Sequence, residues 1–150
     1  MHILPDVLAD NLTTVFCGTA ASAVSARRGA YYAGPGNAFW STLYETGLTP
    51  RLLQPEEFAC VTQFGLGLTD LAKAASGADH ILRKSHFHGS ALQEKIIRHR
   101  PRMLAFTSKR AAQEYLGKPV GYGLLSDRIG TTRIFVLPSP SGAARRYWNP

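Results

Sequence analysis

The stretch Met103-Leu104-Ala105-Phe106-Thr107-Ser108-Lys109-Arg110-Ala111-Ala112-Gln113-Glu114-Tyr115-Leu116-Gly117 predicts a buried strand that leads directly into a helix. Residues 103–107 form a short apolar run, which is typical of a strand covered on both faces. Ser108 is a good N-cap, and apolar side chains then recur at helical spacing until Gly117 ends the helix. A strand followed at once by a helix is the unit from which parallel sheets are built.

Three other apolar segments have the character of strands: residues 13–17, 64–71 and 133–137. Between them, residues 122–129 are rich in glycine, and we expect them to be irregular. Because the strands alternate with helices, the sequence predicts an α/β fold, a three-layer α/β/α domain with a central, mostly parallel sheet. We expect residues 1–150 to form this single domain.

Capping residues predict where the remaining helices begin. Asn37 is a favourable N-cap for a helix that ends at Gly47, and proline with two acids opens a short helix at Pro55. Ser90 and Gln93 fit a capping box for a helix that Pro101 stops. The apolar faces of the first and last of these helices are Phe39, Trp40, Leu43 and Tyr44, and Leu92, Ile96 and Ile97.

The chain is basic, with 17 Lys and Arg against 10 Asp and Glu and a formal charge of +7, which points to a polyanionic partner. No apolar run is long enough to span a bilayer, and no basic segment followed by an apolar one opens the chain. We therefore expect a cytoplasmic monomer without membrane contact, associated with the nucleoid when it acts. Basic residues that could converge on one ligand are Arg27-Arg28, Arg83-Lys84, Arg98 to Arg102, Lys109-Arg110 and Arg145-Arg146.

Cysteine and histidine usage gives no sign of a metal or a cofactor. Cys17 and Cys60 are far apart and belong to no metal-type pair, so we expect reduced, partly buried thiols. His86 and His88 lie two residues apart, but no cysteine or carboxylate stands at ligand spacing beside them.

Ligands of parallel α/β sheets bind at the carboxyl ends of the strands. There the sequence places the small-residue loop 18–22, the acid Asp70, and residues 138–146. An isolated buried carboxylate is costly, so we expect Asp70 to be exposed in a cleft or hydrogen-bonded. Pro138, Pro140 and Gly142 define a preset loop, either an ordinary surface turn or a loop that approaches a phosphate backbone.

Three stretches in this order resemble the uracil-DNA glycosylase superfamily, and most closely its mismatch-specific branch, which includes thymine-DNA glycosylase. They are Phe16-Cys17-Gly18 with its small loop, Tyr32-Ala33-Gly34-Pro35-Gly36-Asn37-Ala38-Phe39-Trp40, and Leu137-Pro138-Ser139-Pro140-Ser141-Gly142. The resemblance covers residues 13–146. It implies a monofunctional enzyme of base excision repair that flips a damaged nucleotide out of the DNA duplex and hydrolyses its N-glycosidic bond without a cofactor.

The resemblance also implies roles for individual residues. Tyr32 matches the aromatic residue that stacks on the flipped base, where its alternative role is packing on the sheet. The base would be contacted further by Cys17, Gly18, Ala20 and Asn37. The loop that enters the minor groove and holds the flanking phosphates would comprise Ser139, Ser141, Gly142, Ala143, Arg145 and Arg146.

The chain departs from the family pattern at two positions. The mismatch branch has an asparagine that positions the hydrolytic water, and here Ala20 stands at that place. We expect Asp70 to replace it, because a carboxylate can orient water and stabilise a sugar cation; Thr19 and Ser22 are weaker candidates, and an N-cap or surface acid is the alternative role of Asp70. Ala143 stands where a larger wedge is usual, so Arg145 or Arg146 would hold the orphaned base.

Two other functions fit parts of this sequence. Without the usual asparagine, the same fold could recognise mismatches or abasic sites and perform no chemistry. A serine hydrolase using Ser139 or Ser141 with His86 or His88 is a weaker alternative, because the chain has no Gly-x-Ser-x-Gly nucleophile elbow.

Overall fold

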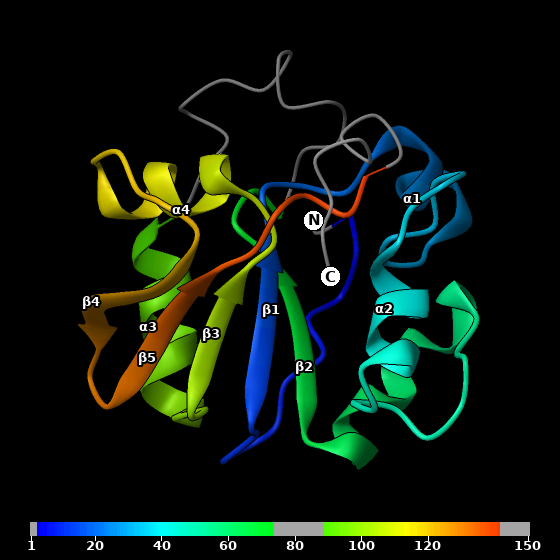
Figure 1. Ribbon diagram of the computed structural model, residues 1–150, viewed down its shortest axis with the longest axis horizontal. Helices are drawn as coiled ribbons and strands as arrows, with labels where there is room; N and C mark the ends of the chain where they lie inside the picture. Colours follow the sequence, from blue (N-terminus) through cyan, green and yellow to red (C-terminus); the bar gives the residue numbers. More distant parts are fainter. Residues whose placement is uncertain (1–2, 74–88, 142–150) are drawn as a thin grey trace.

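A computed structural model describes residues 3–73 and 89–141 of the chain. Its centre is a sheet of five strands in the order β2-β1-β3-β5-β4 (Figure 1). The four strands from β2 to β5 in this order pair in parallel, and β4 pairs with β5 in the antiparallel direction. The strands are β1 (Thr14–Gly18), β2 (Leu66–Asp70), β3 (Met103–Phe106), β4 (Gly123–Ile129) and β5 (Thr132–Val136).

Helices cover both faces of the sheet, which confirms the predicted α/β class (Figure 1). On one face, α2 (Phe39–Glu45) and the 3₁₀ helix η1 (Pro55–Phe64) pack on apolar side chains of β1 and β2, with α1 (Ala23–Arg28) beside them. On the other face, α3 (Gly89–His99) and α4 (Lys109–Leu116) pack on the alternate side chains of β1 and β3. Strands with two covered faces need apolar residues at successive positions, as residues 103–106 have.

The register of the sheet brings three strand ends together. Gly18 of β1 lies opposite Asp70 of β2, and Cys17 lies opposite Phe106 of β3. The chain therefore leaves β1, β2 and β3 at one edge, and Thr107, the residue after β3, lies at that edge too. This is the edge at which parallel α/β sheets bind ligands.

Residues 123–129 form strand β4, so our prediction of an irregular segment there is wrong. β4 is the edge strand, and its side chains alternate between exposed and half-buried. An edge strand needs no continuous run of apolar residues, and glycine is uncommon inside strands. The glycine-rich sequence therefore gave no indication of a strand here. Helix α1 was likewise not predicted, although Ser22 caps it by accepting a hydrogen bond from the Ser25 amide at 3.1 Å.

Two predicted helix starts differ in detail from the structure. Helix α2 begins at Phe39 with Ala38 as its N-cap, and the Asn37 side chain supports this start by accepting a hydrogen bond from the Phe39 amide at 3.0 Å. Helix α3 includes Ser90 in its first turn, so Ser90 is not the N-cap. The Ile97 side chain is 52% exposed, because it lies about 100° around the helix from the buried Ile96.

Both cysteines are free thiols, with Cys17 buried and Cys60 half-buried, as expected. Of the helices in the described part of the chain, none has the length and apolar character needed to cross a bilayer.

Candidate active site

Three oxygen atoms from three segments gather around Gly18. The position that a Cβ atom on Gly18 would take lies 2.9 Å from Asp70 Oδ1, 3.3 Å from Thr107 Oγ1 and 3.4 Å from the Tyr32 hydroxyl. Contacts this close leave no room for a side chain at residue 18. A carboxylate and two hydroxyls therefore converge at the carboxyl end of β1, and glycine is what lets them do so.

Asp70 is a buried acid without a close cation. Its residue exposure is 6%, and no ion pair within 4 Å forms to it from the described residues. Burial raises the pKa of Asp70 to about 6, against the opposing positive charge of Lys73 and a hydrogen bond with the Gly18 backbone. Of our two expectations for this acid, an open cleft and a hydrogen bond, the structure supports the hydrogen bond. A carboxylate with a pKa near neutrality suits a general base.

Tyr32 lies between the sheet and helix α2. Its hydroxyl shares a 3.0 Å hydrogen bond with Thr107 Oγ1, and its ring stacks on Phe39 with centroids 3.9 Å apart. Burial raises the pKa of Tyr32 well above its ordinary value, so this hydroxyl stays protonated. The backbone φ of Tyr32 is 53°, in the left-handed region that few residues with side chains adopt. Such strain persists only where neighbouring contacts hold the segment.

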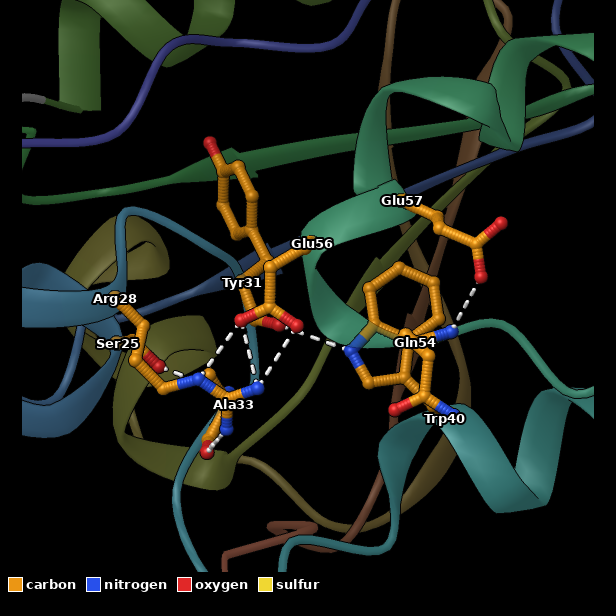
Figure 2. A network of polar contacts seen from close by, with 8 residues as sticks. All are labelled: Ser25, Arg28, Tyr31, Ala33, Trp40, Gln54, Glu56 and Glu57. Atoms are coloured by element: carbon orange, nitrogen blue, oxygen red, sulfur yellow. Dashed lines mark hydrogen bonds and ion pairs between the residues drawn. The ribbon is translucent and has the colours of Figure 1, made fainter.

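Figure 2 shows the contacts that hold the backbone on both sides of Tyr32. Before it, the Tyr31 carbonyl accepts a 2.9 Å hydrogen bond from Trp40 Nε1 of α2. After it, the Ala33 amide donates to Ser25 Oγ at 3.0 Å, and the Ala33 carbonyl accepts from Arg28 Nη1 at 2.8 Å. Arg28 in turn pairs with Glu56 at the start of η1 through Nε and Nη2, each at 2.8 Å. Helices α1, α2 and η1 thus fix the ring of Tyr32 over the site.

The loop after β1 contributes backbone more than side chains. Thr19 is buried, and its carbonyl accepts from the Ala72 amide at 2.7 Å; Ala20 is half-buried. The hydroxyl of Ser22 serves as the α1 cap. Cys17 points away from the site into the core beneath α3 and α4, and its carbonyl accepts from the Thr107 amide at 3.0 Å.

The loop after β5 folds back toward helix α2. The Pro140 carbonyl accepts a 2.8 Å hydrogen bond from the Ala38 amide, which ties this loop to the residue after Asn37. Within the loop, Ser139 Oγ accepts from the Ser141 amide at 3.3 Å. Four residues of the predicted DNA-binding loop lie outside the described residues: Gly142, Ala143, Arg145 and Arg146.

Sequence reasoning missed Thr107, which it treated as the end of an apolar strand. The available signal was a polar residue at the carboxyl end of a parallel strand. Of the basic groups that could converge on one ligand, Arg98 to Arg102 precede β3 and so lie at the opposite end of the sheet from Gly18. Arg28 pairs with Glu56. Within residues 3–73 and 89–141, no cluster of three His, Cys, Asp or Glu could hold a metal ion.

The structure is thus a three-layer α/β domain with a carboxylate and two hydroxyls at the edge where sheets of this kind bind ligands. The family model of the Uracil DNA glycosylase superfamily matches residues 5–149, and the chain belongs to this superfamily. Among solved structures, the solution structure of a proposed uracil DNA glycosylase from Methanosarcina acetivorans is similar, with a TM-score of 0.63 and 24% sequence identity. The match covers 97% of this chain and 88% of that chain, and it confirms the fold.

Proposed function

We propose that this protein is a monofunctional DNA glycosylase that removes uracil from mismatched DNA, with Asp70 as its water-activating residue. Membership of the superfamily implies glycosylase chemistry on DNA. The observation that carries the finer proposal is the buried Asp70 carboxylate, which faces Gly18 with no cation paired to it in the described part of the chain. It lies at the site edge where Ala20 supplies no polar group.

The proposed reaction uses Asp70 in two ways. Its negative charge stabilises the sugar cation that develops as the bond between the sugar and the base breaks. It also orients a water molecule, whose oxygen bonds to the anomeric carbon of the sugar while one water proton passes to the carboxylate. The base departs with the electron pair of the broken bond. Because the pKa of Asp70 is about 6, the carboxylate is mostly ionised at neutral pH and ready to accept that proton.

Tyr32 and Thr107 would bind the base. Phe39 covers one face of the Tyr32 ring, so a flipped base would stack on the other face. The Tyr32 and Thr107 hydroxyls share one hydrogen bond, and Thr107 Oγ1 also donates to the Cys17 carbonyl at 3.5 Å, so the pair can offer lone pairs to donors on a base edge. Stacking and hydroxyls suit several bases, and we therefore expect release of thymine or hypoxanthine as well as uracil.

The test is incubation with labelled duplexes that carry one uracil opposite guanine or adenine, followed by alkaline cleavage at abasic sites. We expect more cleavage of the guanine duplex, because a mispaired base leaves the stack more easily. Asp70→Asn keeps the shape of the side chain and should reduce base release by about a hundredfold or more while duplex binding is retained. Release by Asp70→Asn at the wild-type rate would contradict the assignment of Asp70.

A second candidate function is recognition of mismatches or abasic sites without catalysis, and Ala20 favours it. Binding assays cannot separate the two functions, because both depend on phosphate contacts that salt weakens. The cleavage assay separates them: tight binding with no cleavage of either duplex would establish the binding module. The serine hydrolase alternative would need His86 or His88, which lie outside the described residues, and superfamily membership disfavours it.

A further inference from the structure

A group of exposed arginines lies at the end of the sheet opposite Gly18. Strands β3 and β5 begin at this end, and the close of helix α3 and the turn between β4 and β5 lie there too (Figure 1). We call the group the distal arginine surface; its members are Arg98, Arg100, Arg102, Arg128 and Arg133.

Two of these arginines form a like-charge pair across the sheet. Arg128 of β4 and Arg133 of β5 stand directly opposite each other in the antiparallel register. Side chains in such positions point to the same face of the sheet, with Cβ atoms about 4.5–5.5 Å apart. Like charges placed this way destabilise a sheet, and no ion pair within 4 Å reaches either guanidinium from the described residues. An anion bound at this pair would remove the repulsion.

Backbone contacts bring the other three arginines to the same end. The Arg133 amide donates to the Arg102 carbonyl at 3.1 Å, so the residue before β3 lies beside the start of β5. Residues 100–102 alone connect α3 to β3. Such a short connection keeps Arg98, in the last turn of α3, and Arg100 close to the start of β3.

The acids near this surface are mostly engaged elsewhere. Asp10 Oδ1 lies 2.9 Å from Nδ1 of His99, and Asp127 Oδ2 pairs with Lys118 Nζ at 2.9 Å. The exposed Glu94 stands one helical turn before Arg98. Most of the positive charge at this end is therefore left without a neighbouring acid in the part of the chain that the structure describes.

The exposed cations of the surface are all arginines, and this favours phosphate as their ligand. The guanidinium group is planar, is weakly hydrated, and presents parallel N–H groups that match two phosphate oxygens. Several such groups at one end of a domain fit the regularly spaced phosphates of a nucleic acid backbone. Since the chain belongs to a superfamily that acts on DNA, DNA is the polyanion that this surface meets.

A single duplex does not reach both the site and the distal arginine surface. The site lies at the carboxyl ends of the parallel strands, and the arginines lie at their start. A strand of five residues is about 17 Å long, and the two ends face in opposite directions. Duplex DNA is stiff over about 150 base pairs, so it does not bend around a domain of this size unaided.

We propose that the distal arginine surface binds the phosphate backbone of a second DNA segment while a first segment occupies the site. One protein molecule would then bridge two duplexes and could pass from one to the other without leaving DNA. Because this binding uses phosphates, it is independent of sequence and damage. The inference rests on the DNA binding of the proposed function, and it does not require uracil release.

The test is a bridging assay with undamaged DNA. One short duplex is attached to beads, and a second, labelled duplex is added with the protein at low salt. We expect the wild-type protein to retain label on the beads. Arg128→Gln/Arg133→Gln should reduce the retained label by about tenfold, and the log-log salt slope of second-duplex binding should become shallower by about 2, for two lost phosphate contacts.

A matched control separates the surface from net charge. Arg133→Gln alone should reduce bridging by about threefold. Arg51→Gln removes the same charge from an exposed arginine that already pairs with Glu57 at 2.7 Å, and it should leave bridging unchanged. Equal losses in these two variants would overturn the proposal, because net charge would then explain both.

Sedimentation with an excess of short duplex gives the composition of the bridged complex. We expect one protein molecule with two duplexes. A complex that holds two protein molecules, a wild-type protein that retains no second duplex, or a double variant that bridges as well as wild type would each overturn the proposal. Arg128→Gln/Arg133→Gln should fold, because both side chains are exposed and their repulsion is removed. Should it not fold, Arg98→Gln/Arg102→Gln gives the same test from α3 and the residue before β3.

Single-turnover uracil release from one short duplex separates this inference from the proposed function. Arg128→Gln/Arg133→Gln should release uracil at the wild-type rate, since both residues lie at the far end of the sheet. Bridging without uracil release in any variant would refute the catalytic proposal and leave the second surface standing. Uracil release without bridging would overturn the second surface alone. Loss of both bridging and release in the double variant would assign the two arginines to the first DNA site and overturn the inference.

Discussion

Two aspartates near strand β2, the half-buried Asp6 and the buried Asp70 at the end of the strand, have opposite environments. Asp6 receives a hydroxyl and two ammonium groups. Burial alone would raise its pKa, yet hydrogen bonds from Lys95 and Thr69 and the charge of Lys73 hold that pKa below the ordinary value. Asp70 has no such direct cation in the described part of the chain, and burial raises its pKa to about 6. The fold thus supplies partners for the charge of Asp6, whereas the charge of Asp70 is buried without a paired cation among the described residues.

The contrast shows that one carboxylate stabilises the folded state and the other lowers its stability. An ion cluster such as that of Asp6 fixes the start of the chain against the sheet and is stable only if complete. A buried carboxylate without a paired cation, such as Asp70, lowers the stability of the folded state. Titratable groups with shifted pKa values of this kind are concentrated at functional sites. The same substitution at the two positions should therefore have opposite effects on folding.

The largest effect on stability is expected at Asp6. Asp6→Asn leaves Lys73 and Lys95 without their shared counter-ion, and the free energy of unfolding should fall by about 3 kcal/mol at neutral pH. Because the pKa of Asp6 is lowered in the fold, its contribution is present above the ordinary value of 3.8 and is lost as pH falls below it. Urea denaturation at several pH values measures this; a loss that does not shrink under acid conditions would contradict the ion-cluster explanation.

Gly18→Ala should damage the Asp70 region without damaging the Asp6 region. The new Cβ would lie 2.9 Å from Asp70 Oδ1, so the carboxylate must move. Misplacement of a catalytic group by about 1 Å costs about a hundredfold in rate, and we expect a loss of that size in single-turnover uracil release. Gly34→Ala is the matched control, because its nearest contact would be an ordinary 3.9 Å to Ser22 Oγ. Equal losses in both variants would argue against a special role for Gly18.

Asp70→Asn should stabilise the protein by about 3 kcal/mol above pH 6, since a pKa raised from 3.8 to about 6 makes ionisation costly in the fold. The sign follows from proton binding: the folded state holds the Asp70 proton more tightly than the unfolded chain. The penalty is absent below about pH 4, grows from there, and is complete above about pH 6. Thermal unfolding of wild type and variant across this range tests it, and a variant less stable than wild type at neutral pH would refute it.

The smallest effect is expected for a carboxylate on the surface. Glu56 pairs with Arg28, but the two side chains are 51% and 43% exposed, so Glu56→Gln should change the unfolding free energy by at most about 1 kcal/mol. The pair nevertheless belongs to the network that holds the backbone around Tyr32. A small change in KM for uracil duplexes with unchanged stability would show that the network orients Tyr32. A large stability loss would contradict the contrast between exposed and buried carboxylates.

Local patterns in the sequence determined most of the sheet and its helices. The apolar runs of β1, β2, β3 and β5 and the Ser108 cap of α4 each depend on neighbouring residues only, and so they could be predicted. Edge strand β4 and helix α1 escaped prediction because both are partly exposed and carry weak periodicity. Asp70 was singled out because an acid at the end of an apolar strand conflicts with its surroundings, and such a conflict is visible in sequence.

Only the tertiary structure decided which groups surround that acid. The parallel register of β1, β2 and β3 brings Gly18, Asp70 and Thr107 to one edge of the sheet. Tyr32 reaches the same place from the loop between α1 and α2. Asp6 and Lys73 are 67 residues apart in the chain, and no spacing rule connects them. Electrostatic coupling depends on distance and burial in three dimensions, neither of which the order of residues contains. The sequence alone identified the carboxylate, and the fold determined its charge state.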